Sequence, residues 1–328
     1  MAKQKKQIPS FVFRHPSVTW ILILIVAAFV LWEQYAPQDE SAGSSAAPAA
    51  ADTSSASALF TAGGPMEVHF LDVGQGDSEL IRIPTADGYF DMLIDTGEYQ
   101  HADGLVAYLK SQNITKLDAV VATHPHADHI GSMATVIRSF DIGDFYMPRL
   151  PEDQTPTTKS YETMLDALLE KNVSVHEIYK DSYVDAPVGT VIEVAAPEKD
   201  AVHKEINNYS AVMRLTYGST SFLFTGDAEA ESEDSMLTGG KNLQAQVLKC
   251  GHHGSHSSTT EEFLQAVSPQ YAVISCGADN SYGHPHKETL AALQDFGCEI
   301  LRTDTMGTIV MTSDGKSLSV ETGRPSAQ

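Results

Sequence analysis

The stretch His124-Pro125-His126-Ala127-Asp128-His129 decides how this chain of 328 residues is interpreted. It follows an apolar run at residues 117–122, which we expect to be a buried strand, and it precedes a stretch with helical spacing. Imidazole and carboxylate groups together suit Zn²⁺, with Mn²⁺ or Fe as alternatives. Two positions apart on an extended segment, His124 and His126 point the same way. The sequence therefore predicts a metal site at a strand end, with four candidate ligands: His124, His126, Asp128 and His129.

Strand and helix patterns alternate on both sides of this cluster. Before it, three runs separated by turn residues favour strands, at 66–72, 78–83 and 89–94. We predict helices at 105–109, 130–140 and 161–169, strands at 211–217, 221–225, 246–248 and 271–275, helices that start at 261 and 287, and closing strands near 300 and at 308–312. Two β-rich halves, each followed by helices, indicate an α/β domain with two packed sheets covered by helices.

The N-terminal part has the pattern of a membrane anchor. Residues 1–17 carry four basic side chains and no acid, and residues 18–32 carry no charge. With its flanks, the segment 18–35 is long enough to cross a bilayer, and the preceding positive charge predicts that the N-terminus stays inside. A cleaved signal peptide is the alternative. Residues 36–64 are rich in Ala, Ser and Pro and are predicted to be a flexible linker, which leaves 65–324 as the exported folded domain.

Composition limits the other features. The net charge of −22 repels polyanions at long range, and Lys241, Lys249 and Arg214 are too sparse to predict a basic groove. The three cysteines, Cys250, Cys276 and Cys298, form no disulfide framework, although one bridge stays open. Near the proposed metal site, Cys250 and Cys276 are expected to be packed or paired rather than ligands.

The His124 motif resembles the second motif of the metallo-β-lactamase superfamily, His-x-His-x-Asp-His. The resemblance implies an αββα sandwich in which His124 and His126 bind a first metal and Asp128 and His129 a second. Asp95, in Ile94-Asp95-Thr96-Gly97, resembles the acid that orders the metal loop from behind. Asp227, in Phe224-Thr225-Gly226-Asp227, resembles the carboxylate that bridges the two metals.

Three further stretches resemble the ComEC-type branch, the soluble hydrolase domain of competence-related DNA-uptake proteins. They are Leu71-Asp72-Val73-Gly74-Gln75-Gly76-Asp77, Leu248-Lys249-Cys250-Gly251-His252-His253-Gly254-Ser255 and Asn280-Ser281-Tyr282-Gly283-His284-Pro285. The resemblance covers residues 66–322. A single predicted membrane segment cannot form the channel of those proteins, so only the hydrolase is expected to be shared.

The chain departs from the superfamily at the third motif. Its histidine should lie just before the strand at 211–217, where the sequence reads Ile206-Asn207-Asn208-Tyr209-Ser210. Asn is a poor zinc ligand, so Asn207, like Asp77, is expected behind the ligands, and His203 stays open as a substitute. Our hypothesis is that the pair His252-His253 completes both metal shells, with Asp227 bridging.

Other polar residues have two interpretations each. His284 is either a proton donor or substrate contact, or a loop residue that orders the site. Ser255 and Ser257 precede a predicted helix, where they either belong to a cap with a Thr259–Glu262 capping box or contact a substrate phosphate. His15, His101 and His176 are expected at the surface.

These residues predict a hydrolase with two zinc ions. Two such ions lower the pKa of a bridging water towards ~7 and supply hydroxide at neutral pH, with Asp128 or Asp227 orienting it. The ComEC-type resemblance implies a membrane-anchored phosphodiesterase or nuclease that acts on exogenous DNA. The alternatives are a phosphodiesterase for cell-wall or teichoic-acid polymers and, in another class, a non-catalytic binding module stabilised by metal. The double-histidine motif disfavours β-lactam hydrolysis.

Overall fold

A computed structural model of the chain describes residues 64–323. The predicted basic tail (1–17), membrane segment (18–35) and linker (36–64) lie outside the described residues, apart from Gly64. Within residues 64–323, every helix is too short or too polar to cross a bilayer.

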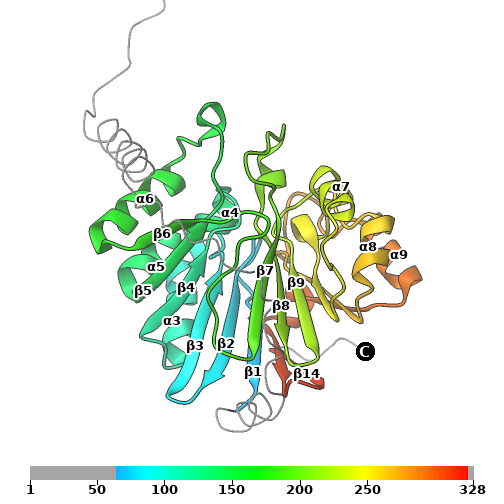
Figure 1. Ribbon diagram of the computed structural model, residues 1–328, viewed down its shortest axis with the longest axis horizontal. Coiled ribbons are helices and arrows are strands. Elements are labelled where there is room, and N and C mark those ends of the chain that lie inside the picture. Colours follow the sequence, from blue (N-terminus) through cyan, green and yellow to red (C-terminus); the bar gives the residue numbers. More distant parts are fainter. Residues whose placement is uncertain (1–63, 324–328) are drawn as a thin grey trace, which may run out of the picture. The chain divides into compact units, whose positions relative to one another are not determined.

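The first sheet has eight strands in the order β14-β13-β1-β2-β3-β4-β5-β6 (Figure 1). Its half from β14 to β3 is antiparallel, and its half from β3 to β6 is parallel. The strands are β1 Met66–Phe70, β2 Glu79–Thr85, β3 Gly88–Ile94, β4 Lys116–Val121, β5 Asp141–Met147, β6 Ser174–Glu177, β13 Ile309–Ser313 and β14 Leu318–Thr322.

The second sheet has six strands in the order β12-β11-β10-β9-β8-β7. The strands from β12 to β9 are parallel, and β8 and β7 join them in antiparallel pairs. Both sheets are therefore mixed. The strands are β7 Thr190–Ala196, β8 Val212–Tyr217, β9 Thr220–Phe224, β10 Val247–Lys249, β11 Tyr271–Ile274 and β12 Glu299–Arg302.

Helices cover the outer face of each sheet, as Figure 1 shows. One apolar cluster joins the inner faces of the two sheets, for example Phe70 to Phe224, and each outer face packs a second cluster against its helices. The αββα prediction is thus confirmed. The helices are α3 Ala102–Ser111, α5 Met133–Ser139 and α6 Lys159–Lys171 on the first sheet, and α7 Ala230–Thr238, α8 Glu261–Val267 and α9 Lys287–Phe296 on the second. Short helices complete the described part of the chain: α4 Ala127–Ile130, α10 Thr303–Met306, and the 3-10 turns η1 Tyr99–His101, η2 Glu152–Gln154, η3 Ile206–Tyr209 and η4 Gly251–Gly254.

Two local predictions were wrong. The helix expected over 130–140 is divided into α4 and α5, because the Ser132 amide leaves the helical ladder and donates to the carbonyl of Gly97 (3.1 Å). The expected Thr259–Glu262 capping box is also displaced. Thr260 caps α8 by accepting from the Phe263 amide, whereas Thr259 has a φ of +59°.

The directions of the strands place the polar loops after β3, β4, β9 and β10 together at one edge of the domain. Ile94 of β3 pairs in parallel with Val121 of β4, so Asp95 and the histidine cluster leave their strands side by side. In the second sheet, Phe224 of β9 pairs in parallel with Lys249 of β10, which places Asp227 beside the Gly251–Gly254 turn. Carboxyl ends of parallel strands are the usual place for an α/β site, and this fold puts two such ends together.

Candidate metal centre

Main-chain hydrogen bonds join the loops that carry the candidate ligands. The Asp77 amide donates to the carbonyl of Asp128 (3.2 Å), and the Thr96 amide donates to that of His129 (2.7 Å). Gly76 has a φ of +141°, and a Cβ at this position would lie 2.2 Å from the Asp128 carbonyl oxygen. This turn therefore requires glycine, both for its backbone angle and for the approach of the histidine loop.

A first group of possible ligands comprises His124, His126 and Asp227. The Nε2 atom of His124 lies 2.9 Å from Nδ1 of His126 and 3.9 Å from Oδ2 of Asp227. Burial, together with the nearby His129, lowers the pKa of both His124 and His126. Both rings are therefore neutral at pH 7 and have a lone pair available for a metal.

A second group comprises Asp77, His129, Asp227 and His253, all buried. Nε2 of His129 is 3.1 Å from Oδ1 of Asp227, and Nε2 of His253 is 3.6 Å from its Oδ2. Burial would raise the pKa of Asp227, but His129 and His253 hold it well below its usual value. Asp227 belongs to both groups, which is the position that a bridging carboxylate requires.

Asp128 contacts this second group from its edge. Its Oδ2 accepts from Nε2 of His253 at 3.2 Å, and it is a quarter exposed. Burial works to raise the pKa of Asp128, but the hydrogen bond from His253 and the nearby His129 lower it. The carboxylate is therefore charged at neutral pH and is directed towards the same histidine as Asp227.

Asp95 lies behind the histidine cluster, as its motif implied. Its Oδ2 accepts from Nδ1 of His129 (2.7 Å), and its Oδ1 accepts from the Thr123 amide (2.8 Å). Since Nδ1 of His129 is used in this way, Nε2 is left to face Asp227. A carboxylate that holds the far nitrogen of a histidine fixes the tautomer of the ring and its orientation.

Lys249 is a buried residue of the site that the sequence did not reveal. Its Nζ lies 2.5 Å from Oδ2 of Asp77, and both side chains are 1% exposed. Oδ1 of Asp77 in turn lies 3.2 Å from Nδ1 of His253, which also donates to the Ser275 carbonyl (3.0 Å). Desolvation works to lower the pKa of Lys249, yet Asp77 and Glu79 raise it, so the ammonium stays charged. The only sequence signal was its position beside the double-histidine motif.

His252 is held differently from His253. Nδ1 of His252 contacts Oε1 of Glu229 (3.0 Å), the Ser257 hydroxyl (3.2 Å) and Nδ2 of Asn207 (3.4 Å). Its Nε2 lies 3.9 Å from Oδ2 of Asp227, beside the first group. The pair thus separates, with His253 beside the second group and His252 beside the first. Glu229 is another residue that the sequence analysis missed.

Several other candidates have structural partners. The hydroxyl of Ser255 bonds to that of Ser257 (3.0 Å), which donates to Glu229 (3.0 Å), so both serines order the loop of His252. His203 pairs with Glu231 (2.7 Å) rather than entering either group. The exposed His176 pairs with Asp144 (2.8 Å), and His101 is half-buried. All three cysteines, which lie within the described residues, are free, so the bridge left open is not formed.

His284 lies beside both members of the histidine pair. Its ring centroid is 5.4 Å from that of His252 and 6.0 Å from that of His253. Burial and the neighbouring rings of His253, His252 and His286 lower its pKa to about 4. His284 is therefore neutral at pH 7, which disfavours an imidazolium acid but leaves an N–H to bond a substrate. Its buried Nδ1 has no hydrogen-bond partner among the described residues.

Buried atoms without a hydrogen bond at the centre fit metal ions. Nε2 of His129 and Oδ1 of Asp227 are 3.1 Å apart, yet neither has a hydrogen bond, and Oδ1 of Asp77 is buried in the same state. Buried polar atoms without hydrogen bonds are costly unless another ligand satisfies them. Imidazole and carboxylate donors around a shared carboxylate suit Zn²⁺ or Mn²⁺.

Two mixed sheets between helix layers, with buried histidines and carboxylates at the strand ends, define the class of αββα metal-binding folds. The profile of the Metallo-beta-lactamase superfamily matches residues 71–278, and the chain belongs to this family.

Its relatives include competence proteins of the ComEC type. The chain is 35% identical to ComE operon protein 3 of Bacillus subtilis (strain 168) over 264 residues, 74% of this chain and 32% of that protein. It is 31% identical to Competence protein ComA of Neisseria gonorrhoeae, over 73% of this chain and 31% of that one. The match thus spans about a third of the length of these relatives. Among solved structures, a diphosphatase from the PhnP family matches at 14% identity and a TM-score of 0.43, covering 76% of this chain and 99% of that one.

Proposed function

We propose that the chain is a dinuclear metal-dependent phosphodiesterase that cleaves a polymer such as DNA. The observation that carries this proposal is the shared carboxylate of Asp227, which joins two groups of buried or half-buried imidazoles within reach of one another. Two divalent ions held there would supply an activated water and a positive field for the phosphoryl oxygens. A structural zinc site would need four closed ligands and no such shared group.

The proposed metal ligands form two sets, which share Asp227. His124, His126 and Nε2 of His252 would hold one ion, and His129, His253 and Asp128 would hold the other. The Asp227 carboxylate would bridge them. Asp95 keeps Nε2 of His129 turned inward through its 2.7 Å hydrogen bond to Nδ1. Asp77, which stands among the second group, is held by Lys249 and serves as a further support for His253.

The remaining polar groups would act on the substrate. His284 is neutral, so it would bond a leaving-group oxygen through its N–H rather than deliver a proton as a cation. Asp128 is charged and exposed enough to accept a proton from an incoming water.

The experiment combines metal content with hydrolysis of bis(p-nitrophenyl) phosphate by the purified full-length chain. We expect two metals per chain and activity that falls at least a hundredfold in Asp227→Asn, because loss of a charged bridging ligand weakens both sites. Asp144→Asn is the matched control, since Asp144 is a largely exposed carboxylate whose ion-pair partner among the described residues is His176. A wild-type chain that holds two metals but hydrolyses no phosphodiester would contradict the proposal and favour a binding module.

We further propose that residues 18–35 anchor the chain in the cell membrane with the catalytic domain outside, and that competence-related DNA is the substrate. The apolar run after a basic tail supports the first part, and the names of the relatives support the second. Protease added to intact cells should remove the domain but not the tail. A domain that stays protected until lysis would contradict export.

A further inference from the structure

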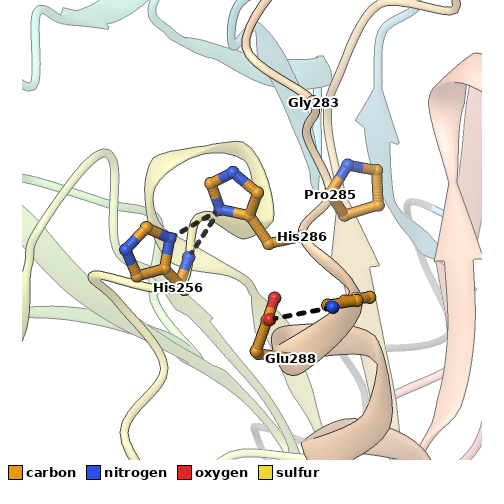
Figure 2. Close-up of a pocket in the computed structure, with 6 residues that line it drawn as sticks. His256, Gly283, Pro285, His286 and Glu288 are labelled. Atoms are coloured by element: carbon orange, nitrogen blue, oxygen red, sulfur yellow. Dashed lines mark hydrogen bonds and ion pairs between the residues drawn. The ribbon is translucent and has the colours of Figure 1, made fainter.

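A pocket beside the metal centre has features that the proposed hydrolysis does not use. It is lined by His256, Gly283, Pro285, His286, Lys287 and Glu288 and has a volume of about 660 Å³ (Figure 2). These residues come from the loop after η4, from the loop that leads into α9 and from the first turn of α9, so two segments distant in the sequence form its walls. None of them belongs to the two groups of candidate metal ligands.

A row of imidazoles connects this pocket to the metal centre. Ring centroids are 6.0 Å apart between His253 and His284, 4.9 Å between His284 and His286, and 4.6 Å between His286 and His256. The pocket is therefore adjacent to His284, the residue that lies beside both groups of candidate metal ligands. A polymer cleaved at the centre would extend into this space with its next unit.

The contacts of His286 fix which of its nitrogens can donate. Its Nδ1 accepts from the backbone amide of His256 (3.0 Å) and lies 2.9 Å from Nδ1 of that residue. Because Nδ1 is the acceptor, a neutral His286 carries its proton on Nε2. Figure 2 shows this second nitrogen on the side of the ring away from His256. No hydrogen-bond partner for it occurs among residues 64–323.

Two further features of the pocket favour an anion. The helix α9 begins here, and its N-cap residue His286 gives no side-chain hydrogen bond to the first turn, so main-chain N–H groups stay available. Lys287 is almost fully exposed, and its Nζ is 3.7 Å from Oε1 of Glu288. An exposed pair at that distance neutralises little of the lysine charge. Glu288 is the one acidic group in the lining and opposes an anion.

We propose that this pocket is a second phosphate subsite, which binds the phosphodiester adjacent to the one at the metal centre. The His286 Nε2–H, the first turn of α9 and Lys287 would bind its oxygens, and His256 would hold His286 in place. The inference rests on the proposed phosphodiesterase function and makes the enzyme selective for polymers over single diesters. DNA and poly(glycerol phosphate) share this chemistry, so both are used as probes.

The first experiment compares the kinetics of His256→Ala/His286→Ala with those of the full-length wild type. A dinucleotide offers one phosphodiester and a hexanucleotide offers several. We expect KM for the hexanucleotide to rise about tenfold, the worth of one hydrogen bond to a charged group, with kcat and the dinucleotide KM unchanged. His176→Ala, which removes an exposed histidine elsewhere, should change neither. An equal loss of kcat/KM for the dinucleotide and the hexanucleotide would refute the subsite, because it would indicate damage to the catalytic centre.

A second variant gains rather than loses affinity, which misfolding cannot imitate. Glu288→Gln removes the only opposing charge from the lining, and we expect it to bind the hexanucleotide two- to fivefold more tightly. Binding is measured by fluorescence anisotropy in EDTA, with labelled hexanucleotide and labelled poly(glycerol phosphate) in parallel. The subsite accepts the polymer that Glu288→Gln binds more tightly, and the histidine variant less tightly, than the wild type does.

Binding in EDTA also separates the two proposals. If the metal-loaded wild type hydrolyses no phosphodiester but the variants still shift polymer binding as expected, the proposed function fails and the subsite stands. If neither polymer binds the wild type, or if both variants bind as the wild type does, the subsite is refuted whatever the hydrolysis assay gives.

Discussion

Lys249→Met removes the one ammonium group buried beneath the metal-binding groups, within the described part of the chain. The ammonium lies 2.5 Å from Asp77 and 3.0 Å from the carbonyl of Cys250, and Lys249 is only 1% exposed. Methionine keeps much of the length of the side chain but removes the ammonium partner of Asp77, whose carboxylate keeps only the contact of its Oδ1 with His253 (3.2 Å) and lies near the buried Glu79. Removal of one partner of a buried ion pair destabilises a protein by about 3–5 kcal/mol. We expect Lys249→Met to lie in that range.

The assay is the free energy of unfolding from denaturant titrations of the full-length chain in EDTA. Lys116→Met is the matched control, because Lys116 forms a similarly short pair with Asp118 (2.6 Å) but is 55% exposed. An exposed pair of this kind contributes about 0–1 kcal/mol. If the two variants lose the same free energy of unfolding, the inference that burial makes the Lys249 pair more stabilising than an exposed pair is refuted.

The same variant has a pH signature with a defined sign. Burial opposes ionisation of Asp77, but Lys249 and His253 hold its folded pKa below the ordinary value. An acid with a lowered pKa stabilises the fold above its ordinary pKa and loses that contribution as the pH falls through the folded pKa. The stability difference between wild type and Lys249→Met should therefore narrow below about pH 4. A constant difference from pH 7 to pH 3 would contradict this account.

Three other predictions follow from packing, ionisation and metal binding. Gly76→Ala should destabilise the chain by at least 2 kcal/mol more than Gly88→Ala (~1 kcal/mol), because both glycines have positive φ but only the Gly76 Cβ would meet the Asp128 carbonyl; equal losses in denaturant titrations would exclude the steric cause. Burial raises the pKa of Glu233 in the folded state. The stability that Glu233 contributes below its ordinary pKa should therefore fall as the pH rises through the folded pKa, and Glu233→Gln should lack this pH dependence of the unfolding free energy. Removal of metal by EDTA should lower Tm by several degrees, and an unchanged Tm would show that the centre does not bind metal in the folded state.

The strong apolar patterns made most of the core strands predictable, but not β5, β6, β7 or β14. Strands β6 and β14 were not predicted, because their side chains are mostly exposed or half-buried and lack a clean alternation. The strand β5 contains two aspartates and a glycine, which read as turn residues. Such strands form because neighbours in the sheet supply hydrogen bonds, which the sequence of one segment cannot reveal.

The candidate site was predicted to a similar extent. His124, His126 and His129 have residue types and spacing that identify them directly, whereas Asp227 was identified by its resemblance to the bridging carboxylate of the superfamily. The structure brings all four together. Lys249 and Glu229 could not be found in this way, because a lysine in an apolar strand and a glutamate after a turn each resemble ordinary surface residues. Their importance arises from partners 172 and 23 positions away. The departure at Asn207 was visible, but the way in which His252 and Glu229 surround it was not.

The main-chain bonds between the Gly76, Asp95 and His129 loops have a consequence for how such a centre can change. These loops are joined by main-chain amides and carbonyls, which every residue except proline provides. A side chain at a ligand position can therefore be exchanged without displacing its neighbours. The absence of the third-motif histidine at residues 206–210 illustrates this freedom. Backbone hydrogen bonds form the loops of the site, whereas side chains select the metal. New metal preferences can therefore arise through single substitutions.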